Sequence, residues 1–418
     1  MNKLINLILI YLAIFLWILA IKKDYENDSV SKQYLKNGDM YFENQIYIDA
    51  LENYKKSEDV KSDKNTRNKI FESYLELNNY KEAFNYLNSI NFDHETIIKN
   101  QERILNKFIK EKDYKNYNKY MNLSDKIVYE KFNKKYYGKI IYLENFYDDV
   151  DYIVQDKDRF IVNSGGWKVI NNLGKIISTK YDKIYGFYNN FITVSDKKGS
   201  VLIDENKVVR GKFFNQNDYN FQSGFVVVKN NDKYKYAIQT GEIKSKDYKQ
   251  ASNFQNDIAV VIDKGIQIIN QNFEVMKKVD GDDFKKDGRN NAIYNNKIIV
   301  KNGMKYKLYD IKDEKYSKEY DEIDFDYGDL IAVKNKGKWG FIDQEFNVKI
   351  EFMYDEAKSF SSKVGIIKIN DEDYIIDKNN NMLEKINGKL YPFNIDGISF
   401  VKQNEKYVMV KLMRSIYD

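Results

Sequence analysis

Hydrophobic and polar positions follow three different patterns along this chain. Residues 4–21 are almost all apolar, apolar positions then recur at helical spacing to about residue 128, and short apolar runs separated by polar turns fill the rest. These periods predict a single apolar helix, a set of amphipathic helices and an array of strands. We therefore expect an α+β multidomain chain with segments at 1–23, 31–128 and 129–418.

The apolar segment 1–23 has the properties of a transmembrane signal anchor. A helix rises about 1.5 Å per residue, so the run 4–21 would cover most of a roughly 30 Å hydrocarbon core. Ile18 stands where cleavage after Ala20 would require a small residue, which favours an uncleaved anchor over a cleavable signal peptide. The flanking lysines do not decide the orientation. By its position the segment resembles bacterial signal anchors, so we expect a single-pass membrane protein whose bulk is extracytoplasmic.

A period of about 34 residues runs through segment 31–128, as expected of stacked helical hairpins. Its first unit resembles the tetratricopeptide repeat family, because it places the marker residues of that family at the matching spacing: Tyr34, Gly38, Tyr41, Ala50 and Tyr54. Two degenerate units follow, the first with Phe71, Tyr74 and Ala83 and the second with Leu105 and Tyr117.

The tetratricopeptide resemblance implies a concave peptide-binding surface. Some members of the family clamp a peptide carboxylate with Lys and Asn, but the corresponding positions here hold Leu35 and Asp39. The resemblance therefore does not support that ligand. A helical spacer that carries the next domain is an equally good interpretation of the segment.

Three marker positions share one register in segment 129–418, with copies about 33 residues apart. The first marker, which we call the slot, is occupied by Trp167, Ser200, Tyr234, Ile266, Tyr306, Trp339 and Asp373, with a truncated copy at Lys406 and a faded one at Asn133. An aromatic residue, mostly followed by Asp or another polar residue, comes next, at Tyr147, Tyr181, Phe214, Tyr248, Tyr320 and Tyr354. The third marker is apolar, at Phe160, Val194, Val227, Val261, Val333, Ile366 and Phe400.

The core Trp339-Gly340-Phe341-Ile342-Asp343, the following Tyr354-Asp355 and the strand from Phe360 to Ile367 resemble the bacterial WG (KWG) repeat family. Each copy is too small to fold alone and must stack on its neighbours. About eight units of short strands favour a closed β-propeller over an open β-solenoid, because closure removes exposed strand edges. The slot residues are expected to be core residues, since few copies have Trp.

Composition narrows the function further. The 68 basic and 63 acidic residues are interspersed, so nucleic acid is not expected as a partner. The absence of Cys excludes thiol nucleophiles, Cys-based metal sites and disulfides. The only histidine is His94, which lies in a polar stretch expected to be a surface turn between helices.

One segment breaks the repeat pattern, and it is the natural place to look for chemistry. Residues 280–291 contain Asp280, Asp282, Asp283 and Asp287, but Lys285 and Tyr294 stand where a calcium loop needs oxygen ligands. The segment is Lys-rich and is expected to be exposed. Asp377, Asn379 and Asn381 alternate as well, which is typical of hairpin turns.

The sequence thus singles out no catalytic, cofactor-binding, metal-binding or other binding residue. It predicts a non-enzymatic, membrane-anchored repeat protein that acts as a protein-interaction scaffold, with a protein or peptide as its partner and no cofactor. The alternative is an extracytoplasmic lectin-like protein that binds envelope glycans through exposed aromatic rings. Aromatic residues on the propeller rim would favour the lectin, and aromatic residues inside the blades would favour the scaffold.

Overall fold

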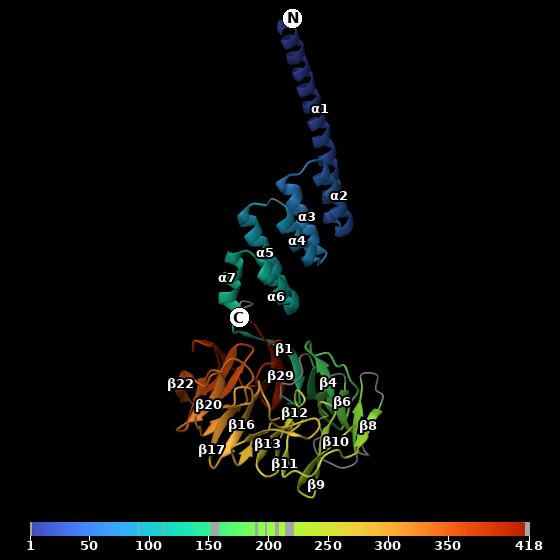
Figure 1. Ribbon diagram of the computed structural model, residues 1–418. Coiled ribbons are helices and arrows are strands. Elements are labelled where there is room, and N and C mark those ends of the chain that lie inside the picture. Colours follow the sequence, from blue (N-terminus) through green and yellow to red (C-terminus); the bar gives the residue numbers. More distant parts are fainter. Residues whose placement is uncertain are drawn as a thin grey trace. The chain divides into compact units, whose positions relative to one another are not determined.

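The computed structural model describes residues 2–90, 92–111, 113–151, 159–188, 191–196, 199–204, 209–213 and 221–413. The chain divides into two compact units, residues 1–135 and 136–418. The first is helical and the second is built from strands (Figure 1).

The helical unit consists of successive antiparallel helices (Figure 1). Side chains of Asp63, Asn79, Asp93 and Asp113 each accept a backbone N–H at the start of the helix that follows, which satisfies donors that have no partner inside the helix. The helices are α1 (Asn2–Glu43), α2 (Tyr47–Val60), α3 (Lys64–Glu76), α4 (Tyr80–Ser89), α5 (His94–Lys110), α6 (Tyr114–Leu123) and α7 (Lys126–Tyr136).

Close packing between α1 and α2 depends on the small residues that the repeat pattern identified. A Cβ atom added to Gly38 would lie 2.5 Å from ring atoms of Tyr54. Ala50 and Tyr54 are both buried, and so is Ala83 in the second hairpin. Residues 31–128 are therefore helical hairpins in which Gly38 and Ala50 allow two helices to approach.

The predicted transmembrane helix is wrong. Within the described part of the chain, no helix is long and apolar enough to cross a membrane. Lys22, Lys23 and Asp24 follow the apolar stretch within the same helix. Helix α1 instead continues without a break into the first hairpin. The extracytoplasmic location of the chain stays a prediction.

The described strands of the second unit form eight antiparallel sheets, which we number as blades in chain order. Blade 1 holds β2 (Asp149–Asp151), β3 (Arg159–Asn163) and β4 (Trp167–Asn171), blade 2 holds β5 (Lys183–Tyr188), β6 (Phe191–Asp196), β7 (Gly199–Ile203) and β8 (Val209–Phe213), and blade 3 holds β9 (Val226–Asn230) and β10 (Lys233–Ala237). Blade 4 holds β11 (Gln250–Ala251), β12 (Ile258–Ile262), β13 (Ile266–Asn270) and β14 (Val275–Val279), and blade 5 holds β15 (Asp283–Phe284), β16 (Lys297–Asn302), β17 (Lys305–Asp310) and β18 (Lys315–Tyr316). Blade 6 holds β19 (Glu322–Ile323), β20 (Ile331–Asn335), β21 (Lys338–Ile342) and β22 (Val348–Tyr354), and blade 7 holds β23 (Glu356–Ser361), β24 (Val364–Ile369), β25 (Glu372–Ile376) and β26 (Met382–Ile386). Blade 8 holds β27 (Lys389–Leu390), β28 (Ile398–Gln403), β29 (Lys406–Leu412) and, from the other end of the unit, β1 (Ile140–Tyr147).

The ring is closed by the pairing of β1 with β29, in which Ile140 lies opposite Leu412 and Tyr147 opposite Tyr407. The unit is therefore a β-propeller, as predicted, and not an open solenoid. Closure of this kind joins strands from both ends of the unit and leaves no first or last blade with a free face.

The repeat register is confirmed with two corrections. All seven residues of the apolar marker lie in strands and are buried, and six of them lie in a middle strand; the seventh, Val227, lies in β9 of the two described strands of blade 3. In the last copy, however, the slot falls on Tyr407, because Lys402 pairs with Tyr407 just as Lys334 pairs with Trp339. Asn133 lies in helix α7 and is not a repeat position. The marker Phe214 lies outside the described residues.

Candidate functional site

The slot residue of one blade packs against the second residue of the strand that begins the next blade. A large slot side chain meets alanine at two interfaces, whereas a branched apolar partner or phenylalanine lies opposite the slot at the others. Each pair shares one hydrophobic cluster: Trp339 with Ala357, Tyr234 with Ala251, Ile266 with Phe284, Tyr306 with Ile323, Trp167 with Ile184, and Tyr407 with Val150. The slot aromatics thus fill the interfaces between blades and are core residues.

The Asp that follows the second aromatic marker also has a structural role. Asp355 opens blade 7, and its carboxylate accepts the Lys338 amino group at 2.7 Å and the backbone N–H of Asn370 at 2.9 Å. Asp321 and Asp148 make the same pair of contacts, each with a lysine of the preceding blade and a glycine N–H in a hairpin turn. At these three places the aspartate ties a blade to the one before it.

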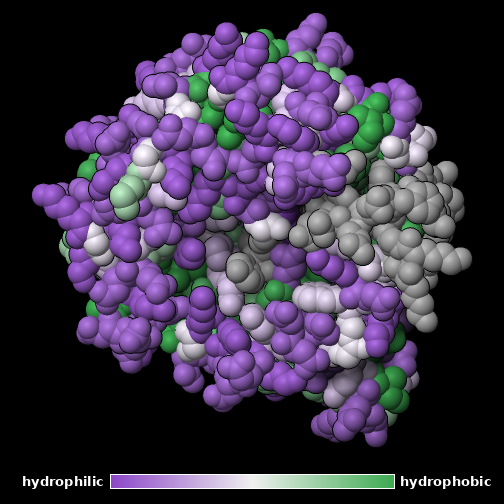
Figure 2. All heavy atoms as spheres, turned by 90° about the horizontal axis from the view of Figure 1, so that it is seen from below, coloured by the Kyte–Doolittle hydropathy of each residue, from purple (hydrophilic) through white to green (hydrophobic). Residues whose placement is uncertain are grey.

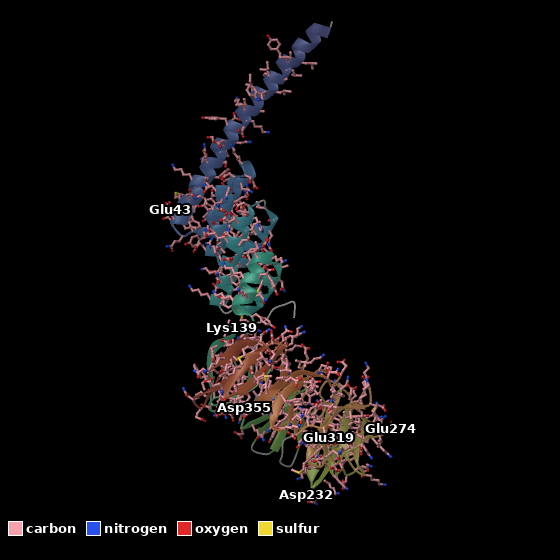
Figure 3. All side chains as sticks on the ribbon, turned by 90° about the vertical axis from the view of Figure 1, so that its left-hand side faces the viewer. Glu43, Lys139, Asp232, Glu274, Glu319 and Asp355 are labelled. Carbon is pink, nitrogen blue, oxygen red and sulfur yellow. The ribbon has the colours of Figure 1, made fainter. Side chains whose placement is uncertain are left out.

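Most aromatic rings at the marker positions therefore lie inside the blades, and the outer surface is largely polar, although Phe146 and Tyr316 are exposed. Tyr147, Tyr248, Tyr320 and Tyr354 of the second marker are all buried. The face of the propeller shown in Figure 2 is largely hydrophilic, with hydrophobic side chains only in scattered places. Charged side chains such as Asp232, Glu274 and Glu319 project from its turns (Figure 3).

An ion pair spans the axis of the ring. Arg289, in the loop between β15 and β16 of blade 5, donates to Asp151 of blade 1 through Nε at 3.0 Å and Nη2 at 2.9 Å. These blades are four places apart in a ring of eight, so they face each other across the channel. The Arg289 side chain is only 5% exposed. The loop therefore fills the middle of the channel.

This loop belongs to the segment 280–291, which was expected to be exposed; Asp280, Asp282 and Gly288 are exposed, but the expectation is wrong for Phe284, Arg289 and Asn291, which are buried. Asp287 organises the loop, because its carboxylate accepts the backbone N–H groups of Arg289 and Asn291 at 2.8 Å each, and the Tyr294 hydroxyl. Burial raises the pKa of Asp287. Asn253 of blade 4 donates to the Arg289 carbonyl at 2.7 Å. The added residues thus form a plug that is pinned to a neighbouring blade.

The acidic residues of the segment do not converge on a cation. Asp282 accepts the Gly303 N–H at 2.7 Å, and Asp283 accepts the side chain of Gln250. Across the described residues, no group of three or more His, Cys, Asp or Glu side chains is placed to hold a metal ion. Asp377 accepts the backbone N–H groups of Asn379 and Asn381, as expected of a hairpin turn.

A second buried group of charges joins blades 5 and 6. The carboxylate of Asp326 is 1% exposed and lies 3.8 Å from the amino group of Lys297, which also lies 3.4 Å from Asp310. Oδ1 of Asp326 accepts three N–H groups, from Gly328, Gln344 and Asn295. Oδ2 has no hydrogen-bond partner. Burial raises the pKa of Asp326 to about 6.

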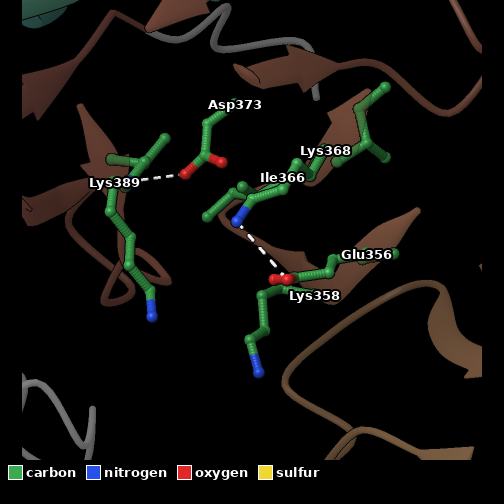
Figure 4. A pocket seen from close by; sticks show the side chains of 9 residues that line it. Glu356, Lys358, Ile366, Lys368, Asp373 and Lys389 are labelled. Carbon is green, nitrogen blue, oxygen red and sulfur yellow. Dashed lines mark hydrogen bonds and ion pairs between the residues drawn. The ribbon is translucent and has the colours of Figure 1, made fainter. Parts of the chain in front are cut away.

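One blade departs from the slot pattern by placing an acid there. Asp373 of blade 7 is 6% exposed, and its Oδ2 accepts the Leu390 N–H at 2.8 Å. Burial raises its pKa. Beside it lies a small pocket of about 30 Å³, open to solvent, with four apolar residues, Glu356 and three lysines in its lining (Figure 4). The signal was visible in the sequence, since Asp373 is the only acidic residue in the slot.

The helical hairpins carry their own series of ion pairs. Asp39 of α1 binds Lys69 of α3 at 2.5 Å, and Glu72 of α3 binds Arg103 of α5 through two bonds of 2.6 and 2.8 Å. Glu102 of α5 then binds Lys131 of α7 at 2.7 Å. Each pair joins alternate helices. Asp39 occupies a position at which some tetratricopeptide repeats bind a peptide carboxylate. Here its carboxylate forms the ion pair with Lys69 inside the helical unit, and it also accepts the Tyr54 hydroxyl.

His94 begins helix α5, and its side chain is 65% exposed. Its Nε2 lies 2.8 Å from the Asp125 carboxylate. This contact links two helix starts at the surface, which agrees with the expectation of an ordinary surface residue.

The model of the WG containing repeat family matches residues 169–203, 316–339 and 339–372. The propeller unit therefore carries WG-containing repeats. No family model matches the helical unit, so its tetratricopeptide character stays a prediction. No curated protein matches the chain.

Solved structures with a similar arrangement include the computationally designed Ika8 protein, at 14% identity and a TM-score of 0.45 over 65% of this chain and 98% of that one. BamB from Moraxella catarrhalis is 10% identical, with a TM-score of 0.45 over 66% of this chain and 97% of its own.

Proposed function

We propose that this chain is a non-enzymatic binding protein whose propeller presents the mouth of its channel to a protein partner. The observation that carries the proposal is the placement of the aromatic residues. They fill the interfaces between blades, while the exposed positions carry charges of both signs. A surface of this kind suits a polar protein interface better than the stacking of sugar rings.

The strands that begin the blades support the choice of the channel mouth. Their first residues are polar or charged, as in Asp149, Lys183, Asp283, Glu322, Glu356 and Lys389, and their second residues are apolar and packed between blades. Alternation of this kind turns the first and second residues to opposite faces of the sheet. The Arg289–Asp151 ion pair crosses the axis of the ring between blades 5 and 1.

The helical hairpins are proposed to act as a spacer. Three ion pairs hold Asp39, Glu72 and Glu102 to lysine or arginine residues of the next hairpin. Charged groups that are already paired within the unit are not available to fix the ends of a peptide.

A photo-crosslinking experiment in the native cells tests the proposal. The crosslinker is placed at Glu322, an exposed first residue of β19, and as a control at Met353, which is 51% exposed on the outer strand of the same blade. We expect a discrete crosslinked protein from Glu322 only. Identical products from both positions, or none from Glu322, would refute a partner at the mouth. Saturable binding of the full chain to an arrayed glycan would favour the lectin alternative instead.

A further inference from the structure

Lys286 lies against two aromatic rings in the segment 280–291, three residues before Arg289. Its amino group is 5.0 Å from the centre of the ring of Tyr234, the slot residue of blade 3, and 6.0 Å from the centre of the Phe284 ring. The residue is partly buried. The amino group is therefore shielded from much of the water that surrounds an ordinary lysine, while a small reagent can still reach it.

The protein offers this amino group one hydrogen-bond acceptor. Lys286 donates to the Ala251 carbonyl at 3.2 Å, and none of the described carboxylates forms an ion pair with it. Other lysines between blades, such as Lys338 and Lys406, are held by aspartates. An ammonium group carries three N–H donors, whereas a secondary amide carries one. The surroundings of Lys286 thus supply as many acceptors as an acylated lysine uses.

Burial decides the protonation of Lys286. Two charges of opposite sign act on it: Asp283 favours the ammonium form, and Lys229 opposes it. Burial has the largest effect and lowers the pKa of Lys286 to about 8. About a quarter of such an amine is neutral at pH 7.5, against about one part in a thousand for a lysine in water. A desolvated lysine of this kind is a nucleophile near neutral pH.

The neighbouring lysine favours an anionic reagent. The Lys229 amino group lies 5.7 Å from the centre of the same Tyr234 ring, and 44% of its side chain is exposed. Its described ion-pair partner is Asp232, which is itself 95% exposed, so solvent screens that pair strongly. Lys229 can therefore attract a phosphate group to the vicinity of Lys286.

We propose that Lys286 is a site of covalent acylation and that small acyl phosphates are its substrates. The neutral amine attacks the acyl carbonyl carbon and forms a C–N bond, the C–O bond to phosphate breaks, phosphate leaves with the electron pair, and the nitrogen loses a proton. The remaining amide N–H keeps the hydrogen bond to the Ala251 carbonyl. The product is neutral, so the cost of burying a charge at this position is removed.

The full chain is treated with acetyl phosphate at pH 7.5, and acetylation of each lysine is followed over time by mass spectrometry of peptides. The exposed Lys264, in a turn of blade 4, is the reference. We expect Lys286 to react about tenfold faster. Its neutral fraction is about 200-fold larger than that of a lysine in water, but nucleophilicity falls with basicity, as it does for thiols. The rate at Lys286 should level off above pH 8.5, and in urea the preference for Lys286 should disappear.

A rate at Lys286 no higher than at Lys264, a rate that rises tenfold per pH unit through pH 9.5, or a preference that persists in urea would each overturn the proposal. None of these measurements needs a variant, so misfolding does not enter. Failure of acetylation together with crosslinking from Glu322 would remove this site and leave the proposed function standing.

The role of Lys229 is tested by Lys229→Gln, with Lys233→Gln, an exposed lysine of the same hairpin, as the matched control. We expect K229Q to slow acetylation of Lys286 by acetyl phosphate more than acetylation by the uncharged reagent p-nitrophenyl acetate, and K233Q to change neither rate. Equal slowing with both reagents would refute the choice of acyl phosphates.

Discussion

Asp326 gives the propeller a pH dependence that can be predicted in sign and size. Its carboxylate is 1% exposed, Oδ2 has no hydrogen bond, and the nearest cation, Lys297, is 3.8 Å away. Burial raises the pKa of Asp326 to about 6, whereas its pKa in the unfolded chain is about 3.9. The folded chain therefore holds this proton more tightly than the unfolded chain does. Ionised Asp326 destabilises the fold, and protonation on acidification removes that cost.

The difference of about 2 pKa units corresponds to about 3 kcal/mol of lost stability above pH 7.5. At pH 4.5 the folded state is almost fully protonated at this site while the unfolded state is mostly ionised, so the cost falls to about 1 kcal/mol. The contribution of Asp326 thus raises stability by about 2 kcal/mol as the pH falls from 7.5 to 4.5. Because the side chain is almost completely buried, solvent screening reduces this value little.

The variant Asp326→Asn removes the titrating group and keeps an acceptor for Gln344 and Asn295. We expect its free energy of unfolding in urea to exceed that of the wild type at pH 7.5, with a gap that shrinks by about 2 kcal/mol at pH 4.5. Asp329→Asn is the matched control in the same loop, where the side chain is 52% exposed. A wild-type-to-D326N gap that does not vary with pH would refute the reasoning, since other titrating groups cancel in that comparison.

Three further predictions concern the propeller and the hairpins. Arg289→Met removes the buried cross-channel ion pair with Asp151, and we expect the propeller to lose about 3 kcal/mol of unfolding free energy in guanidinium chloride, with Arg289→Lys intermediate. Gly340→Ala places a Cβ 2.7 Å from the carbonyl oxygen of Ile350 and should cost about 1–3 kcal/mol, whereas Lys307→Ala, at the equivalent position of blade 5, should be nearly neutral in the same assay. Arg103→Ala breaks a half-exposed ion pair, so a loss above about 1 kcal/mol in thermal unfolding of the helical unit would contradict our view of it as a surface pair.

The propeller fold could be predicted from the sequence because the three marker positions recur in every repeat unit that carries them. Each marker position recurs in several blades, so errors at single residues do not shift the register. Phe400 and Val333 could be assigned to equivalent strands although their surroundings differ in sequence. In the last copy the slot was assigned to Lys406, one residue too early. The structure places it at Tyr407, which pairs with Lys402.

Features that occur once were not predictable in the same way. The pairing of Arg289 with Asp151 joins residues 138 positions apart, and no local pattern indicates that a Lys-rich insertion turns inward to the ring axis. The apolar run at the start of α1 was predicted from length and hydropathy alone, which did not show that the helix continues through Lys22 and Asp24 into the first hairpin. Both features depend on where the backbone goes after the local pattern ends.

The varied slot residues all pack between blades. The residue that shares the interface is Ala357 beside Trp339, Phe284 beside Ile266 and Ile184 beside Trp167, so each interface is filled by its own combination of apolar side chains. This accounts for a family pattern in which the aromatic residue is lost from several copies without loss of the fold. It also isolates blade 7, where Asp373 brings a buried charge and an open pocket to a position that packing alone would fill with an apolar side chain.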